Sequence, residues 1–183
     1  MKNTVKLDTY NNDHFNTGAG RIKRVIWHLV NGLFFNSMFH FYPFKVFLLR
    51  LFGAEVGRNV VIKPHVNIKY PWNLIIADNV WIGENVWIDS LDKVQIGNNV
   101  CISQGALLLC GNHNYSKSTF DLMTGKIILE DGVWIGARSI VCGNVICKSH
   151  SVLSVNGVAA KNLEPYTIYR GNPAEPVKER NIE

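Results

Sequence analysis

The residue best suited to acid–base chemistry is His113, which lies in the stretch LLLCGNHNYSKSTFDLMTGKIILEDG, residues 107–132. A histidine titrates near neutral pH and can therefore take a proton from a reacting group. A lone loop histidine is often only a surface residue, so its surroundings must decide between the two interpretations. Asp89, which directly follows the apolar Ile88, is a second candidate. A carboxylate can orient a histidine ring or contact a substrate, or it can bond to its own turn.

The stretch around His113 interrupts a pattern of apolar residues that otherwise recurs mostly every six residues. The apolar positions are Val56, Ile62, Ile68, Ile76, Ile82, Ile88, Ile96, Ile102, Leu108, Leu129, Ile135, Val141, Cys147 and Leu153. A period of six predicts a parallel β-helix, in which each hexapeptide supplies one short strand and one corner and the coils stack about 4.8 Å apart. An amphipathic α-helix would repeat every 3.6 residues, and a β-sandwich would show less constant spacing.

Irregular steps in the pattern follow Ile68, Ile88 and Leu108, which are 20 residues apart. With three hexapeptides in each coil, these positions fall at the same corner of successive coils. The first two steps add two residues each, whereas the third extrudes a loop over residues 109–128 that carries His113. Long loops inside compact domains are usually functional or disordered. The loop retains residues that can anchor it, which favours function: Tyr115, Phe120, Leu122 and Met123.

Composition and charge indicate a globular chain with a basic front end. Of its 183 residues, 47% are hydrophobic and 18% are charged, which is not the composition of a disordered protein. Residues 1–70 carry ten Lys or Arg and three acids (+7), and residues 71–183 carry nine and eleven (−2). The basic part could meet phosphates or an anionic membrane, or could simply be solvated. No nucleic-acid-binding module is present.

The four cysteines form no C-x-x-C pair and no signal peptide opens the chain, so we expect a cytoplasmic protein.

The segment RIKRVIWHLVNGLFFNSMFHFYPFKVFLLRLFG is predicted to form two helices, near 20–37 and 43–52. Pro43 is favourable in the first turn of the second helix. Polar residues and Pro43 interrupt the apolar run, so we do not expect a membrane-spanning helix. The helices are expected to cap the open end of the β-helix, with docking to a membrane surface as the alternative. The expected organisation is a polar tail and helical cap over 1–53 and a β-helix with a C-terminal tail over 54–183.

Three stretches resemble the hexapeptide-repeat acyltransferases: VWIGENVWIDSLDKVQIGNNVCISQGALLLCGNHNYSKSTFDL, ILEDGVWIGARSIV and GNPAEPVKER. Within that family they are most similar to the colanic acid biosynthesis acetyltransferase group, from about Arg21 to the C-terminus. The resemblance implies a left-handed β-helix, against the usual crossover rule. It also implies a homotrimer with active sites between neighbouring prisms. The implied activity is acetyl-CoA-dependent O-acetylation of a sugar or lipid-linked glycan in exopolysaccharide or surface-glycan synthesis, in the cytoplasm or peripherally at the inner membrane face.

The resemblance also implies roles for individual residues on the catalytic and donor side. His113 corresponds to the general base that takes the proton of the acceptor hydroxyl. Trp134 and Gly136 match the family's W-I-G segment, along which acetyl-CoA is expected to lie. Lys161 aligns with a lysine that contacts CoA in relatives, and Arg180 is expected to meet a CoA phosphate.

On the acceptor side, Asn85 aligns approximately with an acceptor-binding asparagine of related sugar acetyltransferases, although asparagine also suits a β-helix turn. Tyr115 of the loop is expected to contact the substrate, and no metal is expected. Two other functions stay open. A γ-type carbonic anhydrase shares the β-helix but binds zinc through three histidines, two of them five residues apart, and the residue five beyond His113 is Ser118. A non-catalytic scaffold would leave the loop without chemistry.

Overall fold

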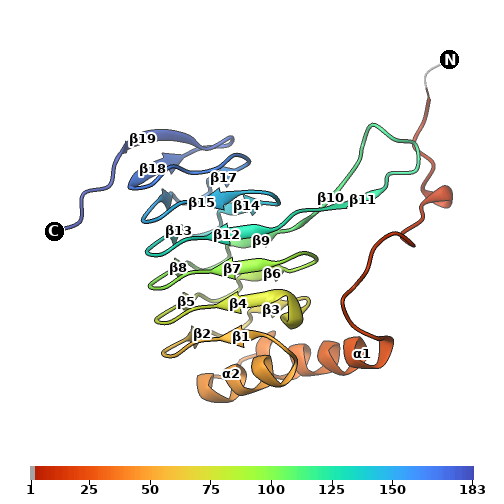
Figure 1. Ribbon diagram of the computed structural model, residues 1–183, viewed down its shortest axis with the longest axis horizontal. Coiled ribbons are helices and arrows are strands. Elements are labelled where there is room, and N and C mark those ends of the chain that lie inside the picture. Colours follow the sequence, from red (N-terminus) through yellow and green to blue (C-terminus); the bar gives the residue numbers. More distant parts are fainter. Residues whose placement is uncertain (1–2) are drawn as a thin grey trace.

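The computed structural model describes residues 3–183 and confirms the predicted left-handed parallel β-helix (Figure 1). Its strands form three parallel sheets, which are the three sides of a prism. The first sheet contains β1 (Glu55–Val56), β4 (Leu74–Ile76), β7 (Val94–Ile96), β12 (Ile127–Leu129) and β15 (Ile146–Cys147). The second contains β2 (Val61–Ile62), β5 (Trp81–Ile82), β8 (Cys101–Ile102), β13 (Trp134–Ile135), β16 (Val152–Leu153), β18 (Thr167–Arg170) and the antiparallel β19 (Glu175–Glu179). The third contains β3 (Asn67–Ile68), β6 (Trp87–Asp89), β9 (Leu107–Leu109), β14 (Ile140–Cys142) and β17 (Val158–Ala159).

Aliphatic side chains stack in columns inside the prism because the register repeats from coil to coil. In the second sheet, Ile62 pairs with Ile82, and Ile82 pairs with Ile102. Ile135 and Leu153 continue the same column, and all five side chains are buried. A register shift of one residue would turn this apolar column outward, so the hexapeptide pattern itself fixes how the coils align.

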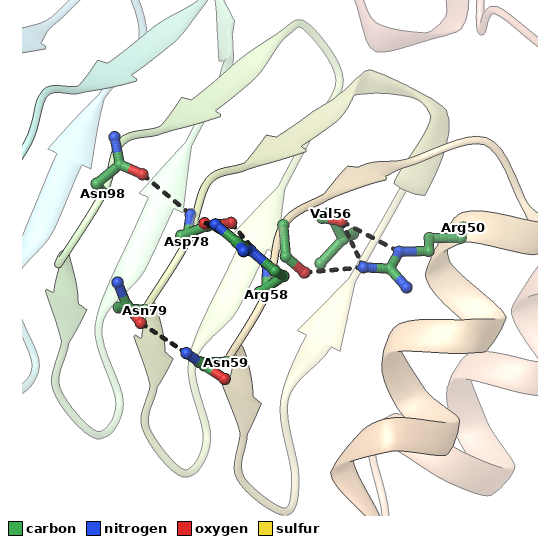
Figure 2. A network of polar contacts seen from close by, with 8 residues as sticks. Arg50, Val56, Arg58, Asn59, Asp78, Asn79 and Asn98 are labelled. Atoms are coloured by element: carbon green, nitrogen blue, oxygen red, sulfur yellow. Dashed lines mark hydrogen bonds and ion pairs between the residues drawn. The ribbon is translucent and has the colours of Figure 1, made fainter.

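Polar turn residues stack at the corners in the same way as the aliphatic residues inside. Asn59 donates its side-chain amide to Asn79, 2.9 Å away, and both residues have positive φ angles (Figure 2). At the same corner, Arg58 Nε and Nη2 both donate to Asp78 Oδ2, at 3.1 and 2.8 Å. Asparagine tolerates the left-handed turn conformation better than other residues that carry a side chain. The corners therefore have a sequence requirement of their own.

Two helices lie across the end of the prism that begins with β1 (Figure 1). They are α1 (Arg21–Val30), which continues into a π-helical segment, η2 (Asn31–Phe35), and α2 (Tyr42–Leu51). Short 3-10 turns occur at Leu7–Thr9 and Pro71–Asn73. Within residues 3–183, no helix has the length and the apolar character needed to cross a membrane.

Side chains of the helices bond to the first strand of each sheet, whose outer edge would otherwise be open. Arg50 donates to the carbonyls of Val56 and Gly57, as Figure 2 shows. Lys45 Nζ donates to the carbonyls of Ile62 and Lys63. At the third sheet, Trp27 Nε1 donates to the Ile68 carbonyl, and the Asn31 side chain accepts from the Ile68 amide. An open strand edge is a site for aggregation, and these bonds occupy it.

Stability is expected to rise with pH between about 8 and 10.5 because of Lys45. Its side chain is fully buried, and this burial lowers the lysine pKa from 10.5 to about 8. In that window the unfolded chain binds more protons at this site than the folded chain, so raising the pH stabilises the fold, by about 2–3 kcal/mol across the window. Urea unfolding of the wild type and of Lys45→Met over this range measures the effect. The rise should be smaller in the variant by that amount; equal slopes would contradict the prediction.

Candidate active site

The loop that interrupts the repeat projects from the corner after β9 as an antiparallel hairpin (Figure 1). Its two strands are β10 (Gly111–His113) and β11 (Leu122–Thr124), and His113 pairs with Leu122 at the outer end of the ladder. The hairpin holds His113 on a defined backbone away from the prism wall. The segment that interrupts the hexapeptide repeat is therefore an ordered hairpin, and His113 is the last residue of its first strand.

The imidazole ring of His113 is fixed by Phe120 of the same loop. Its Nδ1 lies 2.9 Å from the Phe120 carbonyl oxygen, and the two rings stack at 4.4 Å with an interplanar angle of 6°. A carbonyl oxygen only accepts hydrogen bonds, so Nδ1 must carry the hydrogen, and Nε2 of the neutral ring keeps its lone pair. Phe120 has a φ of +51°, which is unusual for an aromatic residue.

Asp89 lies in the same cleft as His113 but is bonded to other partners. Its carboxylate is buried, with Oδ1 3.1 Å from Lys69 Nζ and Oδ2 accepting from the Gly111 amide at 3.3 Å. The sequence suggested that Asp89 orients the His113 ring or contacts the acceptor. Orientation through Nδ1 is provided by the Phe120 carbonyl. Asp89 instead bonds to the first residue of β10, and contact with the acceptor stays a proposal.

The N-terminal tail runs along the projecting loop (Figure 1), a contact that the sequence analysis missed. The Lys6 amide donates to the Ser118 carbonyl at 2.8 Å, and His14 Nε2 lies 3.1 Å from the Leu122 carbonyl. The Tyr10 ring is 5.9 Å from the His113 ring. The tail has no periodic pattern and nothing in it points to a partner about a hundred residues away. It therefore gave no signal in the sequence.

A cleft of about 470 Å³ forms between the tail, the prism and the loop. Its lining residues are Tyr10, Asn12, Phe15, Thr17, Arg24, Lys69, Tyr70, Asp89, Leu91, Leu109, Gly111, Asn112, His113 and Leu122. The cleft thus combines aromatic rings, amides and charged groups around one histidine. Such a lining suits a polar ligand with a hydroxyl group that the histidine can deprotonate.

A second groove, of about 790 Å³, runs over the outer surface of β8, β13, β16 and β18. Trp134, Gly136 and Arg180 all line it, so the structure brings together three of the four residues expected at the donor. Trp134 Nε1 donates to the Ser103 hydroxyl at 2.9 Å. Arg180 Nη1 donates to the carbonyls of Gly132 and His150, which holds the guanidinium at one position along the groove.

Three expected site residues lie outside both depressions. Lys161 is exposed and follows β17. Asn85 is exposed at a corner with a φ of 58°, the conformation that the turn interpretation expects. Tyr115 lies in the loop and is 81% exposed. Within one chain, none of the three lines the His113 cleft or the Trp134 groove.

The two buried cysteines, Cys110 and Cys147, are poor nucleophiles at neutral pH. Burial raises the pKa of the Cys110 thiol to about 12, opposed by its hydrogen bond to the Asp92 carbonyl and helped slightly by the charges of Asp89 and Asp92. Burial also raises the pKa of Cys147 to about 12. The thiolate is the reactive form of cysteine, so neither residue is suited to carry an acyl group. In residues 3–183, no group of three or more His, Cys, Asp and Glu side chains is arranged to hold a metal ion.

Comparison with known proteins identifies the class to which this fold and site belong. No family model matches the chain. One relative is the Escherichia coli (strain K12) protein named Putative colanic acid biosynthesis acetyltransferase WcaF, which is 34% identical over 164 residues, covering 89% of this chain and 90% of the relative. The galactoside O-acetyltransferase of the same strain is 26% identical over 137 residues, covering 73% and 68%.

Solved structures share the fold. A hexapeptide-repeat acetyltransferase from Vibrio cholerae, complexed with acetyl coenzyme A, has a TM-score of 0.82 at 19% identity, covering 96% of this chain and 97% of that one. A galactoside acetyltransferase in complex with coenzyme A has a TM-score of 0.78 at 23% identity, covering 87% and 82%. This chain belongs to the hexapeptide-repeat acetyltransferases, as the sequence motifs indicated. It is therefore an enzyme that transfers an acetyl group, and neither the scaffold nor the carbonic anhydrase interpretation is supported.

Proposed function

We propose that this protein transfers the acetyl group of acetyl-CoA to a sugar hydroxyl in the synthesis of an exopolysaccharide or surface glycan. The observation that carries the proposal is the His113 ring, whose Nδ1–H is held by the Phe120 carbonyl inside a polar cleft. This arrangement leaves Nε2 as the proton acceptor. The matched relatives support the acceptor class, because one is named for colanic acid biosynthesis and another for galactoside acetylation.

The proposed reaction follows from which nitrogen of the His113 ring carries the hydrogen. His113 Nε2 takes the proton of the acceptor hydroxyl while the hydroxyl oxygen attacks the thioester carbonyl. The C–S bond then breaks, the thiol sulfur leaves with the electron pair, and the imidazolium returns the proton to it. Because the buried cysteines are poor nucleophiles, we propose direct transfer from donor to acceptor without an acyl-enzyme.

The donor groove suits acetyl-CoA in shape and charge. The Trp134 groove crosses several coils and has both apolar and polar lining residues, so it can hold an extended pantetheine arm. Arg180 supplies a cation for a phosphate of CoA. The side chains of Ser154 and Val155 form part of the wall. Lys161, on the corner outside the groove, is proposed as a further phosphate contact. The acceptor residues proposed from the sequence, Asn85 and Tyr115, would have to act from a neighbouring protomer.

We propose a homotrimer, because the two halves of the reaction lie apart in one chain. Among residues 3–183, the His113 cleft and the Trp134 groove share no lining residue. The loop projects beyond its own prism (Figure 1), so it can complete the groove of a neighbour in a closed ring. Light scattering tests the mass. Mixing the His113→Ala and Arg180→Ala proteins under subunit exchange should restore part of the activity, and a monomer in solution would overturn the proposal.

The acceptor is tested by following thiol release from acetyl-CoA over nucleotide sugars and lipid-linked oligosaccharides. Acetylation of at least one sugar hydroxyl, located by mass spectrometry and NMR, is the expected result. Transfer only to amines or to water would contradict the proposed function. The free state of the four cysteines supports a reducing cytoplasm as the place of this reaction.

Removing the Tyr10 ring is expected to weaken acceptor binding. The ring lines the cleft 5.9 Å from the His113 ring, so Tyr10→Ala should raise the acceptor KM by about 3- to 10-fold, the effect of losing roughly 1 kcal/mol of aromatic contact. The donor KM should not change. Leu7→Ala, at an exposed position of the same tail, is the matched control. An equal effect of both variants would show that the tail acts only through its folding.

A further inference from the structure

Helix α1 carries two apolar faces, and the prism covers only one of them. Trp27 is buried on the covered side, where its ring packs against Phe35 and Phe52. On the opposite side, five aliphatic side chains are between 48% and 78% exposed: Ile22, Val25, Ile26, Leu29 and Leu33. We call these five residues the outer stripe. Their spacing of three and four residues places them on one face of the helix, and Leu33 extends it into the π-helical segment.

A continuous stripe of this kind is unusual on a protein surface that faces water. Single exposed apolar residues are normal, but contiguous apolar patches mark contact with a protein or a membrane. The outer stripe is not needed for the cap, because the hydrogen bonds to the first strands come from Trp27, Asn31, Lys45 and Arg50. A partner outside the chain must therefore account for its composition.

The charges next to the outer stripe indicate which partner fits. One flank of the outer stripe is basic and carries Arg21, Arg24 and His28. Together with Val25 and Leu29, these residues line a shallow depression on α1. The first 70 residues carry a net charge of +7, against −2 for the rest. An apolar helix face with a basic flank binds the surface of an anionic bilayer, with its aliphatic side chains in the headgroup boundary and its cations at the phosphates.

We propose that the outer stripe of α1 docks this enzyme on an anionic lipid surface. A second copy of the chain in a two-fold contact is a poorer partner, because that contact would bring two basic flanks together. A head-to-tail contact between copies is distinguished by the mass measurement below. The orientation suits the active site. Arg24 also lines the His113 cleft and an adjoining groove of about 600 Å³ that includes Trp27, Tyr70 and Trp87. Docking through α1 would thus place the mouth of the His113 cleft beside the lipid surface. The docking itself does not depend on the identity of the acceptor.

The experiment is co-sedimentation of the full-length protein with vesicles of phosphatidylcholine alone and of phosphatidylcholine with phosphatidylglycerol. We expect the wild type to bind the anionic vesicles, and to bind them less as salt rises. The double variant Ile26→Asn/Leu29→Asn should bind at least tenfold more weakly, because two aliphatic side chains would no longer be buried in the headgroup boundary. The matched control is Val177→Asn/Ile182→Asn, two exposed positions in β19 and in the segment that follows it. Figure 1 shows β19 at the end of the prism opposite the helices.

The outcomes separate docking from catalysis. Failure of the wild type to bind anionic vesicles, or equal losses in the two double variants, would overturn the proposal. A lower molecular mass of Ile26→Asn/Leu29→Asn in light scattering would also overturn it, because the outer stripe would then be an interface between copies. Turnover on a soluble sugar acceptor should be the same for both double variants and the wild type. Loss of vesicle binding with intact turnover thus concerns α1 alone and leaves the proposed function in place.

Discussion

His113→Ala is expected to lower kcat by about 10²–10⁴ while the donor KM and the molecular mass of the assembly stay the same. In the proposed mechanism the ring accepts the proton while the Phe120 carbonyl holds its Nδ1, and no other histidine lines the cleft in residues 3–183. The substitution removes the stacking of the His113 and Phe120 rings in a projecting loop, so it should cost little stability. Steady-state kinetics with the acetylated acceptor as the readout measures the effect.

The control for this prediction is His40→Ala, which removes an exposed histidine that lines neither depression. It should keep wild-type kinetics. Turnover of His113→Ala within a few-fold of wild type would refute the assignment of the base. A parallel loss of donor binding or of the assembly would show that the histidine holds the loop in place and does not take the proton.

Arg180→Ala is expected to raise the donor KM by about 10- to 100-fold with little change in kcat, because a hydrogen bond to a charged group contributes roughly 1.5–3 kcal/mol. The phosphates of CoA lie far from the reacting carbon, so their contacts should be equal in the ground state and the transition state. The effect should shrink at high salt. Kinetics with acetyl-CoA as the varied substrate, in two buffers of different ionic strength, measures both quantities.

Two further variants make this second test decisive. Lys161→Ala shows whether a residue outside the groove also contacts the donor, and a rise in donor KM would place a CoA phosphate at that corner. Arg21→Gln, on the helix at the other end of the prism, should leave donor kinetics alone. Arg180 also bonds to the carbonyls of Gly132 and His150, so the melting temperature of Arg180→Ala must be measured beside its kinetics. A rise in donor KM only for Arg21→Gln would contradict the donor site.

The hexapeptide pattern alone predicted the architecture and the loop that carries the candidate site. Residues such as Ile62, Ile82 and Ile102 recur at the spacing at which coils stack, so burial in a β-helix is a local property that can be counted along the chain. The 20-residue spacing of the irregular steps located the corner from which the loop with His113 projects. Trp134 and Gly136 lie in one groove because they belong to one repeat unit.

Contacts between distant segments became visible only in the folded chain. Tyr10 lies near His113, and Lys69 pairs with the buried Asp89, although neither contact has a signal in the local pattern. The sequence offered Asp89 as a partner for the His113 ring, whereas a backbone carbonyl holds it, and a backbone group cannot be recognised from residue types. The two apolar faces of α1 likewise became distinct only once one of them was covered. Periodic burial is local and repeats along the chain, whereas these contacts depend on how distant segments pack.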